Sequence, residues 1–380
     1  MIRRATIVLA LGALSMPLSA QPSAADLARA RRILQTTPLI DGHNDLAWAI
    51  RRDSAAPMDV RAYDLRKRTP GHTDLERLAK GMVGGQFWSV YIPGEVKDSG
   101  FARVQLEQIE IARQFIAMYP ERFQLALNAR GIRDAFKRKK IGSLLGMEGG
   151  HAIENSLGAL RAYHALGARY MTLTHNVTLD WADAASDSAR HGGLTEFGKE
   201  VVREMNRLGM LVDLSHTSPG TMSDALDVAE APVIFSHSNA RALADVPRNV
   251  PDSILRRLPA NGGVVMVTFV PGFVTTTRGT ATLSQVADHI EHIKRVAGAD
   301  HVGIGGDFDG ISVVVQGLED VSTYPALFAE LVRRGWSDGD LRKLAGENIL
   351  RVMDRAEAVS TRLSRTRPPS TKTIAQLDTK

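Results

Sequence analysis

Five side chains of the kinds that bind metals stand at the ends of four apolar runs in this sequence. Each run has the composition of a buried strand, and a buried strand holds the side chain that follows it in a fixed direction. The five candidates are His43 and Asp45 after the run 38–40, Glu148 after 141–147, His216 after 211–215 and His237 after 232–236. Four strand ends can aim three imidazoles and two carboxylates at one place, so the pattern predicts a two-metal hydrolase.

The first two candidates alternate along one strand end, so the side chains of His43 and Asp45 point the same way. Taken alone, they could equally belong to a turn in which Asn44 and Asp45 make local hydrogen bonds. Glu148 is more informative, because a buried carboxylate without a partner needs a cation or a proton. Its two oxygens can also contact two metals at once, which an imidazole cannot do.

His216 and His237 form a matched pair, since each follows a serine at the end of an apolar run. A single histidine after a strand is more often structural than a ligand, but two on neighbouring strand–helix units favour a metal. The adjacent serines suggest a serine hydrolase as the alternative. Neighbouring residues of a strand face opposite ways, however, and the sequence contains no G-x-S-x-G motif.

Three further residues suit the handling of a substrate. Asp307, at the end of the last apolar run, is interpreted as a proton-transferring carboxylate, with Asp309 as the fallback. His175 ends another run and is a candidate for polarising a substrate carbonyl. Arg248 lies on a proline-containing loop, which could present its guanidinium to a substrate carboxylate. The alternative for Arg248 is a surface residue that forms a salt bridge.

The elements that must position these residues alternate along the chain. The expected strands are 39–45, 85–92, 141–148, 170–175, 210–216, 233–237, 264–270 and 302–307, with a further short run at 125–127. Amphipathic stretches such as 283–296 lie between them, and we expect His289 and His292 to lie on its solvated face. Eight strands alternating with helices predict an α/β fold, the (β/α)8 TIM barrel of metal-dependent hydrolases. An open doubly wound sheet is the alternative.

The two ends of the chain differ in composition from its body. Two arginines, an apolar stretch at 7–14 and small residues before position 21 predict a signal peptide at residues 1–20. Residues 21–360 then form one catalytic domain, and the basic residues 361–380 are expected to be disordered. The apolar stretch is too short to span a membrane. We therefore expect secretion across the inner membrane, most simply into a bacterial periplasm.

The composition restricts the partners and the metal. The net charge is +5, but the positive excess lies in the two ends, so the body is near neutral and nucleic acid is not an expected partner. The chain has no cysteine, which excludes disulfides and thiolate-bound metals. A metal must therefore be held by nitrogen and oxygen atoms, which suits zinc, manganese or cobalt.

Several motifs of this chain resemble the membrane (renal) dipeptidase family. They include Asp41-Gly42-His43-Asn44-Asp45-Leu46, Glu148-Gly149-Gly150-His151, Thr174-His175-Asn176, Asp213-Leu214-Ser215-His216, Arg248-Asn249-Val250-Pro251 and Gly305-Gly306-Asp307-Phe308-Asp309-Gly310. The resemblance runs from about Leu39 to Arg351. Two departures stand out: Ala47 replaces the usual proline, and the chain lacks the lipid-anchor tail and the cysteines that cross-link animal dimers.

The resemblance implies a zinc-dependent metallopeptidase of the amidohydrolase superfamily with two Zn²⁺ per chain. It places His43 and Asp45 on one ion and His216 and His237 on the other, with Glu148 bridging them. It assigns His175 and Asp307 to catalysis, and both of these with Arg248 to substrate binding.

The same resemblance implies that metal-activated hydroxide cleaves dipeptides, including those with a D-residue at the second position. Because the chain departs from the family in lacking the lipid-anchor tail and the cysteines, we expect no membrane anchor after signal cleavage, and any homodimer would be non-covalent. Two alternatives remain open. One is another amidohydrolase activity at the same site, on N-acyl-amino acids, lactones or β-lactams. The other is a non-catalytic binding protein.

Overall fold

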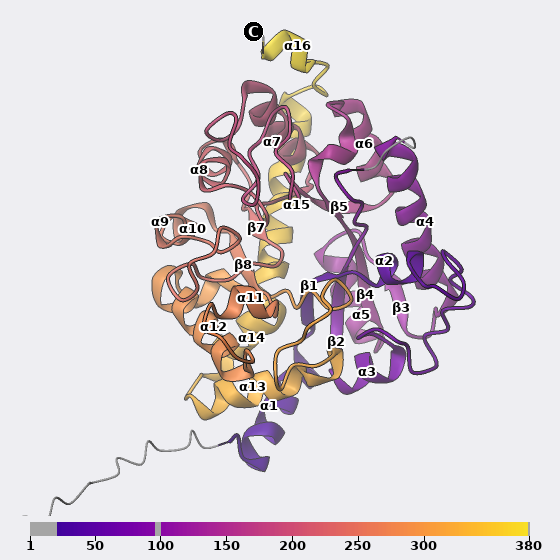
Figure 1. The fold of residues 1–380 in the computed structure, drawn as a ribbon, viewed down its shortest axis with the longest axis vertical. Helices are drawn as coiled ribbons and strands as arrows, with labels where there is room; N and C mark the ends of the chain where they lie inside the picture. Colours follow the sequence, from indigo (N-terminus) through magenta and orange to yellow (C-terminus); the bar gives the residue numbers. More distant parts are fainter. Residues whose placement is uncertain (1–20, 96–99, 379–380) are drawn as a thin grey trace, which may run out of the picture.

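Parallel strands form a closed barrel in this protein, shown by the computed structural model in Figure 1, which describes residues 21–95 and 100–378. The strand order around the ring is β2-β1-β9-β8-β7-β6-β5-β4, and the pairing of β2 with β4 closes it. The strands of the ring are β1 (Leu39–Asn44), β2 (Val83–Ser89), β4 (Ile141–Glu148), β5 (Ala168–Thr172), β6 (Leu211–Asp213), β7 (Ile234–Phe235), β8 (Val264–Val267) and β9 (Val302–Ile304). The additional strand β3 (Phe123–Leu125) lies outside the ring and pairs with the start of β4.

The predicted TIM barrel is confirmed, and each of the eight expected strands corresponds to a strand of the ring. The pairing between β2 and β4 excludes the open doubly wound sheet, which would leave two free edges. Every residue of β1, β2 and β4 is buried, as expected for strands covered on both faces. Several strands end earlier than predicted, because their last residues leave the hydrogen-bonded ladder and form the mouth of the barrel.

Helices connect the strands and surround the ring (Figure 1). The longer ones are α1 (Ala24–Thr36), α4 (Phe101–Met118), α5 (Ala129–Lys137), α6 (Leu157–Ala165), α7 (Glu196–Leu208), α8 (Pro219–Val228), α12 (Leu283–Ala297), α13 (Tyr324–Arg333) and α15 (Asn348–Thr366). The shorter ones are α2 (Leu46–Arg51), α3 (Leu75–Lys80), α9 (Asp252–Leu255), α10 (Leu258–Asn261), α11 (Pro271–Val274), α14 (Asp338–Arg342) and α16 (Ile374–Leu377). Single 3-10 turns occupy Gly150–Ile153, Ala299–His301 and Val321–Thr323, and a π-helical turn occupies Lys343–Glu347.

Polar side chains set where the helices begin. Thr195 accepts a hydrogen bond from the backbone at the start of α7, and Thr282 forms a capping box with Gln285 at the start of α12. Gly209, with φ of 76°, ends α7 in the left-handed conformation that glycine adopts at least cost. These local signals fix where each helix returns the chain to the next strand.

Residues 361–378 pack on the barrel and do not form the disordered tail predicted from composition. The α15 helix continues through Thr366, and its Leu363 is buried. Arg362 and Arg367 each lie 2.9 Å from a carboxylate oxygen of Glu230, which is on the segment after α8. The amino-acid composition shows that this segment is positively charged, but it does not show that a distant carboxylate neutralises the charge.

The face of α12 that was expected to be solvated is buried. His289 is 1% exposed and accepts a hydrogen bond from the backbone of Ala240 while its other nitrogen contacts the carbonyl of Val274. His292 is 7% exposed and lies 2.7 Å from a carboxylate oxygen of Asp252. The expectation of solvation was therefore wrong, and these histidines have structural partners.

The predicted signal peptide, residues 1–20, lies outside the described residues. Within residues 21–95 and 100–378, no helix is both long enough and apolar enough to cross a membrane.

Candidate metal centre and active site

The five predicted ligands form one cluster at the carboxyl ends of the strands, with Glu148 at its centre. Glu148 Oε2 lies 3.3 Å from His43 Nε2, and Glu148 Oε1 lies 3.0 Å from His216 Nε2 and 3.5 Å from His237 Nε2. Asp45 Oδ2 lies 3.2 Å from His43 Nε2. All five residues are buried. The two oxygens of Glu148 thus face two separate sets of ligands, which is the arrangement expected of a bridging carboxylate.

The donor atoms fit bound cations better than a hydrogen-bond network. His216 Nε2 and His237 Nε2 lie 2.9 Å apart, although each ring already has a hydrogen-bond partner at Nδ1. Burial lowers the pKa of both histidines well below the usual value, so both rings are neutral at pH 7. Lone pairs that face each other in this way are stabilised by a cation. His43 Nε2 and Asp45 Oδ1 are also buried, and neither has a hydrogen-bond partner in the described part of the chain.

A second residue orients each histidine at its Nδ1 atom. These partners are Tyr170 Oη for His43 (2.8 Å), Asn176 Oδ1 for His216 (3.0 Å) and Ser236 Oγ for His237 (2.8 Å). Partners of this kind fix the ring tautomer and direct Nε2 towards the metal position. Sequence reasoning missed all three, although each is a polar residue within or beside a predicted strand end.

Three residues that line the site have unusual backbone conformations. His216 has φ of 65°, and Asp307 and Asp309 each have φ of 66°, in the left-handed region that costs non-glycine residues of order 1–3 kcal/mol. Gly310 closes the same corner, since a Cβ there would lie 2.2 Å from Asp45 Oδ2 and 2.7 Å from Asp307 Oδ1. The carboxylates of Asp45 and Asp307 can therefore lie this close to the backbone of residue 310 because that residue is glycine.

Arg248 lines a cavity of about 610 Å³ above the ligand cluster. Its side chain is buried, with the guanidinium carbon 5.1 Å from the centre of the Phe273 ring, and its Nε and Nη1 atoms have no hydrogen-bond partner within residues 21–95 and 100–378. Burial lowers the pKa of Arg248 to about 10, which still leaves the group charged at pH 7. This geometry does not fit a surface salt bridge. A buried cation with free N–H groups suits an anionic ligand.

Asp307 and His175 line the same cavity. Burial raises the pKa of Asp307 well above its usual value, and the charges of Asp45 and Glu148 add to the effect. A carboxyl with a raised pKa can take up and return a proton near neutral pH. His175 Nε2 lies 3.7 Å from Glu148 Oε1, and burial lowers the pKa of this ring. The catalytic roles of both residues stay predictions.

Asp309, the fallback for proton transfer, holds a loop in place. Its carboxylate accepts a hydrogen bond of 2.6 Å from the backbone of His72, and its own backbone N–H donates to His72 Nδ1 over 3.0 Å. The side chain also borders the cavity but is only 1% exposed. We therefore keep Asp307 as the candidate for proton transfer.

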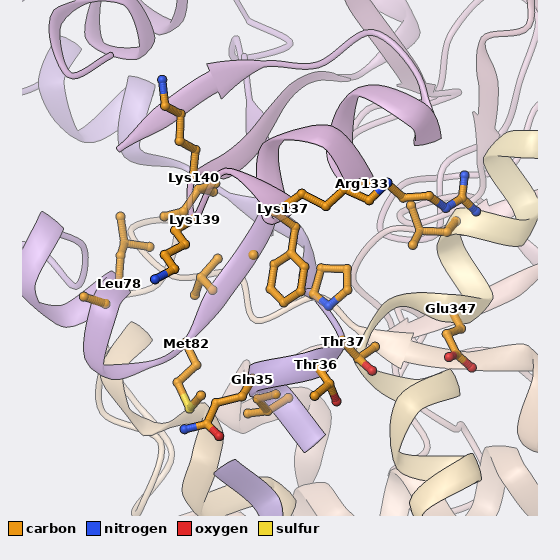
Figure 2. Close-up of a pocket in the computed structure, with 18 of the residues that line it drawn as sticks. Gln35, Thr36, Thr37, Leu78, Met82, Arg133, Lys137, Lys139, Lys140 and Glu347 are labelled. Carbon is orange, nitrogen blue, oxygen red and sulfur yellow. The ribbon is translucent and has the colours of Figure 1, made fainter. Parts of the chain in front are cut away.

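A larger cavity, of about 1260 Å³, lies at the opposite end of the barrel (Figure 2). Its walls come from the starts of β1, β2 and β4, with basic side chains such as Lys137, Lys139 and Lys140 around an apolar floor. In the described part of the chain, its lining includes no predicted site residue. The smaller cavity combines the ligand cluster, a buried cation and perturbed carboxyls, so we assign the chemistry there.

Comparison with known proteins identifies the family of this chain. The family model for membrane dipeptidase (peptidase family M19) matches residues 27–367. A solved structure of dipeptidase AC, a metallopeptidase of family M19, is 28% identical, with 84% of this chain and 99% of that chain covered and a TM-score of 0.76.

A second solved structure is a metallo peptidase from Rhodobacter sphaeroides with a phosphinate mimic of the dipeptide L-Ala-D-Ala. It is 27% identical, with 84% of this chain and 99% of that chain covered and a TM-score of 0.75. The family match spans most of the chain, and the fold agrees over nearly the full length of both relatives. The chain therefore belongs to the membrane dipeptidase family, peptidase family M19, and is a metallo-dipeptidase.

Proposed function

We propose that this protein is an exported dipeptidase that uses two zinc ions and accepts dipeptides with a D-residue at the second position. The observation that carries the proposal is the buried guanidinium of Arg248, whose Nε and Nη1 atoms have no hydrogen-bond partner among the described residues and which lines the same cavity as the ligands around Glu148. If Arg248 binds the free carboxylate of the substrate, the distance between that carboxylate and the ligand cluster is fixed. A longer peptide would place the wrong bond over the ligands.

His43 and Asp45 would hold one ion, His216 and His237 the other, and Glu148 both. When bound, two zinc ions supply Lewis acidity and lower the pKa of a water molecule towards neutrality. Arg248 binds the C-terminal carboxylate of the substrate. His175 polarises the scissile carbonyl, and Asp307 takes a proton and returns it to the leaving amine.

Acceptance of a D-residue is supported by the bound L-Ala-D-Ala mimic in the Rhodobacter sphaeroides relative. Export is supported by the sequence of residues 1–20, and any homodimer would be non-covalent because the chain has no cysteine. Fractionation of cells that express the full chain, with sequencing of the mature N-terminus, tests export.

Metal content and a substrate panel test the chemistry together. Purified enzyme should carry about two zinc ions per chain, and Glu148→Gln should lower the occupancy of both positions because the bridging charge is lost. One ion per active chain would contradict the two-metal proposal. The panel compares L-Ala-L-Ala and L-Ala-D-Ala with an N-acyl-amino acid, a lactone and a β-lactam, and faster cleavage of a non-peptide would favour another amidohydrolase activity.

A further inference from the structure

The strand order separates Arg248 from the cavity residues that follow β1 and β2 across the barrel mouth. In the ring, β2 lies diametrically across from β7, since three strands separate them in either direction. Arg248 lies on the segment after β7, whereas Tyr91 follows β2 and Trp48 and Arg52 follow β1. All four residues line the 610 Å³ cavity. A substrate whose carboxylate contacts Arg248 and whose scissile bond lies at the ligand cluster must extend its first residue towards β1 and β2.

Aromatic rings form the wall on that side. The rings of Trp48 and Tyr91 pack edge to face with their centres 4.9 Å apart, and the Tyr91 ring also lies 4.9 Å from the ring of His175. The flat faces of such rings accommodate the methylene groups of a side chain. This wall therefore suits a first residue with an extended aliphatic stem.

Arg52 supplies the charge at the rim of this wall. It follows α2 directly and is exposed, and within the described ranges its guanidinium has no ion-pair partner, whereas its neighbour Arg51 pairs with Glu107 over 2.6 Å. Burial raises the pKa of Tyr91, and the nearby charge of Arg52 opposes that rise. Glu95 also acts on Tyr91, but it does not line the cavity.

Under the proposed function, on which this inference rests, each of the other charged groups of the cavity has a role: Asp307 exchanges a proton with the substrate, and Asp309 accepts a hydrogen bond from the backbone of His72. The metals balance Asp45 and Glu148, and the substrate carboxylate balances Arg248. Arg52 remains as a cation that faces the first residue of the substrate. We infer that Arg52 makes this dipeptidase selective for dipeptides whose first residue carries a side-chain carboxylate, with glutamyl dipeptides preferred because their longer stem reaches the rim along Trp48 and Tyr91.

Three dipeptides that differ only at the first residue test this inference: L-Glu-L-Ala, L-Gln-L-Ala and L-Lys-L-Ala. We expect the wild-type kcat/KM for L-Glu-L-Ala to exceed that for L-Gln-L-Ala by about fivefold, the size expected of one solvent-exposed ion pair. The difference should lie in KM and should shrink at high salt. Arg52→Gln should bring the ratio close to one. Arg138→Gln, which removes an exposed arginine at the opposite end of the barrel, should leave it unchanged.

Hydrolysis of L-Ala-L-Ala separates this inference from the proposed function. A wild-type enzyme that cleaves L-Ala-L-Ala but shows no preference for the glutamyl substrate would overturn the role of Arg52 alone. An unchanged glutamyl-to-glutaminyl ratio in Arg52→Gln would do the same. If none of these dipeptides is cleaved, the proposed function and the inference both fail.

Discussion

The Ser236 hydroxyl donates a hydrogen bond of 2.6 Å to the buried carboxylate of Asp213. The same hydroxyl lies 2.8 Å from His237 Nδ1. Because its single proton goes to Asp213, Ser236 must accept the proton of His237 Nδ1, which leaves the lone pair of Nε2 directed at Glu148. Asp213 also accepts hydrogen bonds from Thr172 and from two backbone N–H groups, so a single carboxylate joins the ends of β5, β6 and β7.

Ser236→Ala should therefore weaken metal binding without removing a ligand. Loss of a partner that orients a histidine ligand lowers metal affinity by roughly 10- to 100-fold. Competition between the protein and a zinc chelator measures this directly. Ser143→Ala is the matched control, since Ser143 is a buried serine of β4 whose hydroxyl donates a hydrogen bond to the carbonyl of Ile141 and lies outside the ligand cluster. Equal zinc affinities of the two variants would contradict the orienting role.

Asp307→Asn should retain the metals and lose most turnover. The amide is nearly the same size as the carboxyl but cannot take up and return a proton, a role worth roughly 10²–10⁴ in rate. Metal analysis and kcat are measured on the same preparation. If zinc is lost and the rate per remaining metal is normal, Asp307 acts as a ligand, which its position within 4.8 Å of His43 and Asp45 donor atoms also allows.

Arg248→Ala should lose binding of free-acid dipeptides selectively. Removing one partner of a buried charge pair costs roughly 2–5 kcal/mol, which would appear in kcat/KM. Dipeptide amides lack the carboxylate, so the wild type should cleave them poorly and the variant should show little further loss. The measurement is kcat/KM for the free-acid dipeptide and for its amide, on the wild type and on Arg248→Ala. An equal loss on both substrates, with a lower Tm, would instead indicate a structural arginine.

His151 should make the fold sensitive to acid. Burial lowers the pKa of His151 to about 4 in the folded state, below the value of about 6.5 in an unfolded chain. The unfolded state then binds more protons between these values, so the free energy of unfolding falls as the pH decreases from 6.5 to 4. Between pH 7 and 5, His151 alone should contribute about 2 kcal/mol to this loss.

Urea unfolding of the wild type and of His151→Gln, both with chelator present to remove metal effects, checks this pH dependence. The variant should lose less stability over the same pH range. His191→Gln replaces an exposed histidine and should behave as the wild type does. Parallel pH profiles for all three proteins would show that His151 does not titrate with unfolding.

The barrel and the positions of the five candidate ligands at strand ends could be predicted from the sequence, because both depend on local patterns. Once an apolar run forms a strand, the strand determines the direction of the side chain at its end, as it does for Glu148 and His216. What the sequence could not predict depends on contacts between distant segments. The partners of His289 come from positions 240 and 274, and the charges after residue 361 meet Glu230. Composition and periodicity contain no information on such pairs.

Closure of the ring has a consequence for how the metal centre forms. The five candidate ligands lie on or just after β1, β4, β6 and β7, and β1 is hydrogen-bonded to β9, the last strand of the chain. No contiguous fragment shorter than most of the barrel contains them all. All five candidate ligands precede β8 and β9, so a nascent chain that ends before these two strands has every ligand but no closed ring. We expect metal uptake to follow closure, because β8 and β9 join β1 to β7. The rate of zinc capture during refolding should then report on the final step of barrel assembly.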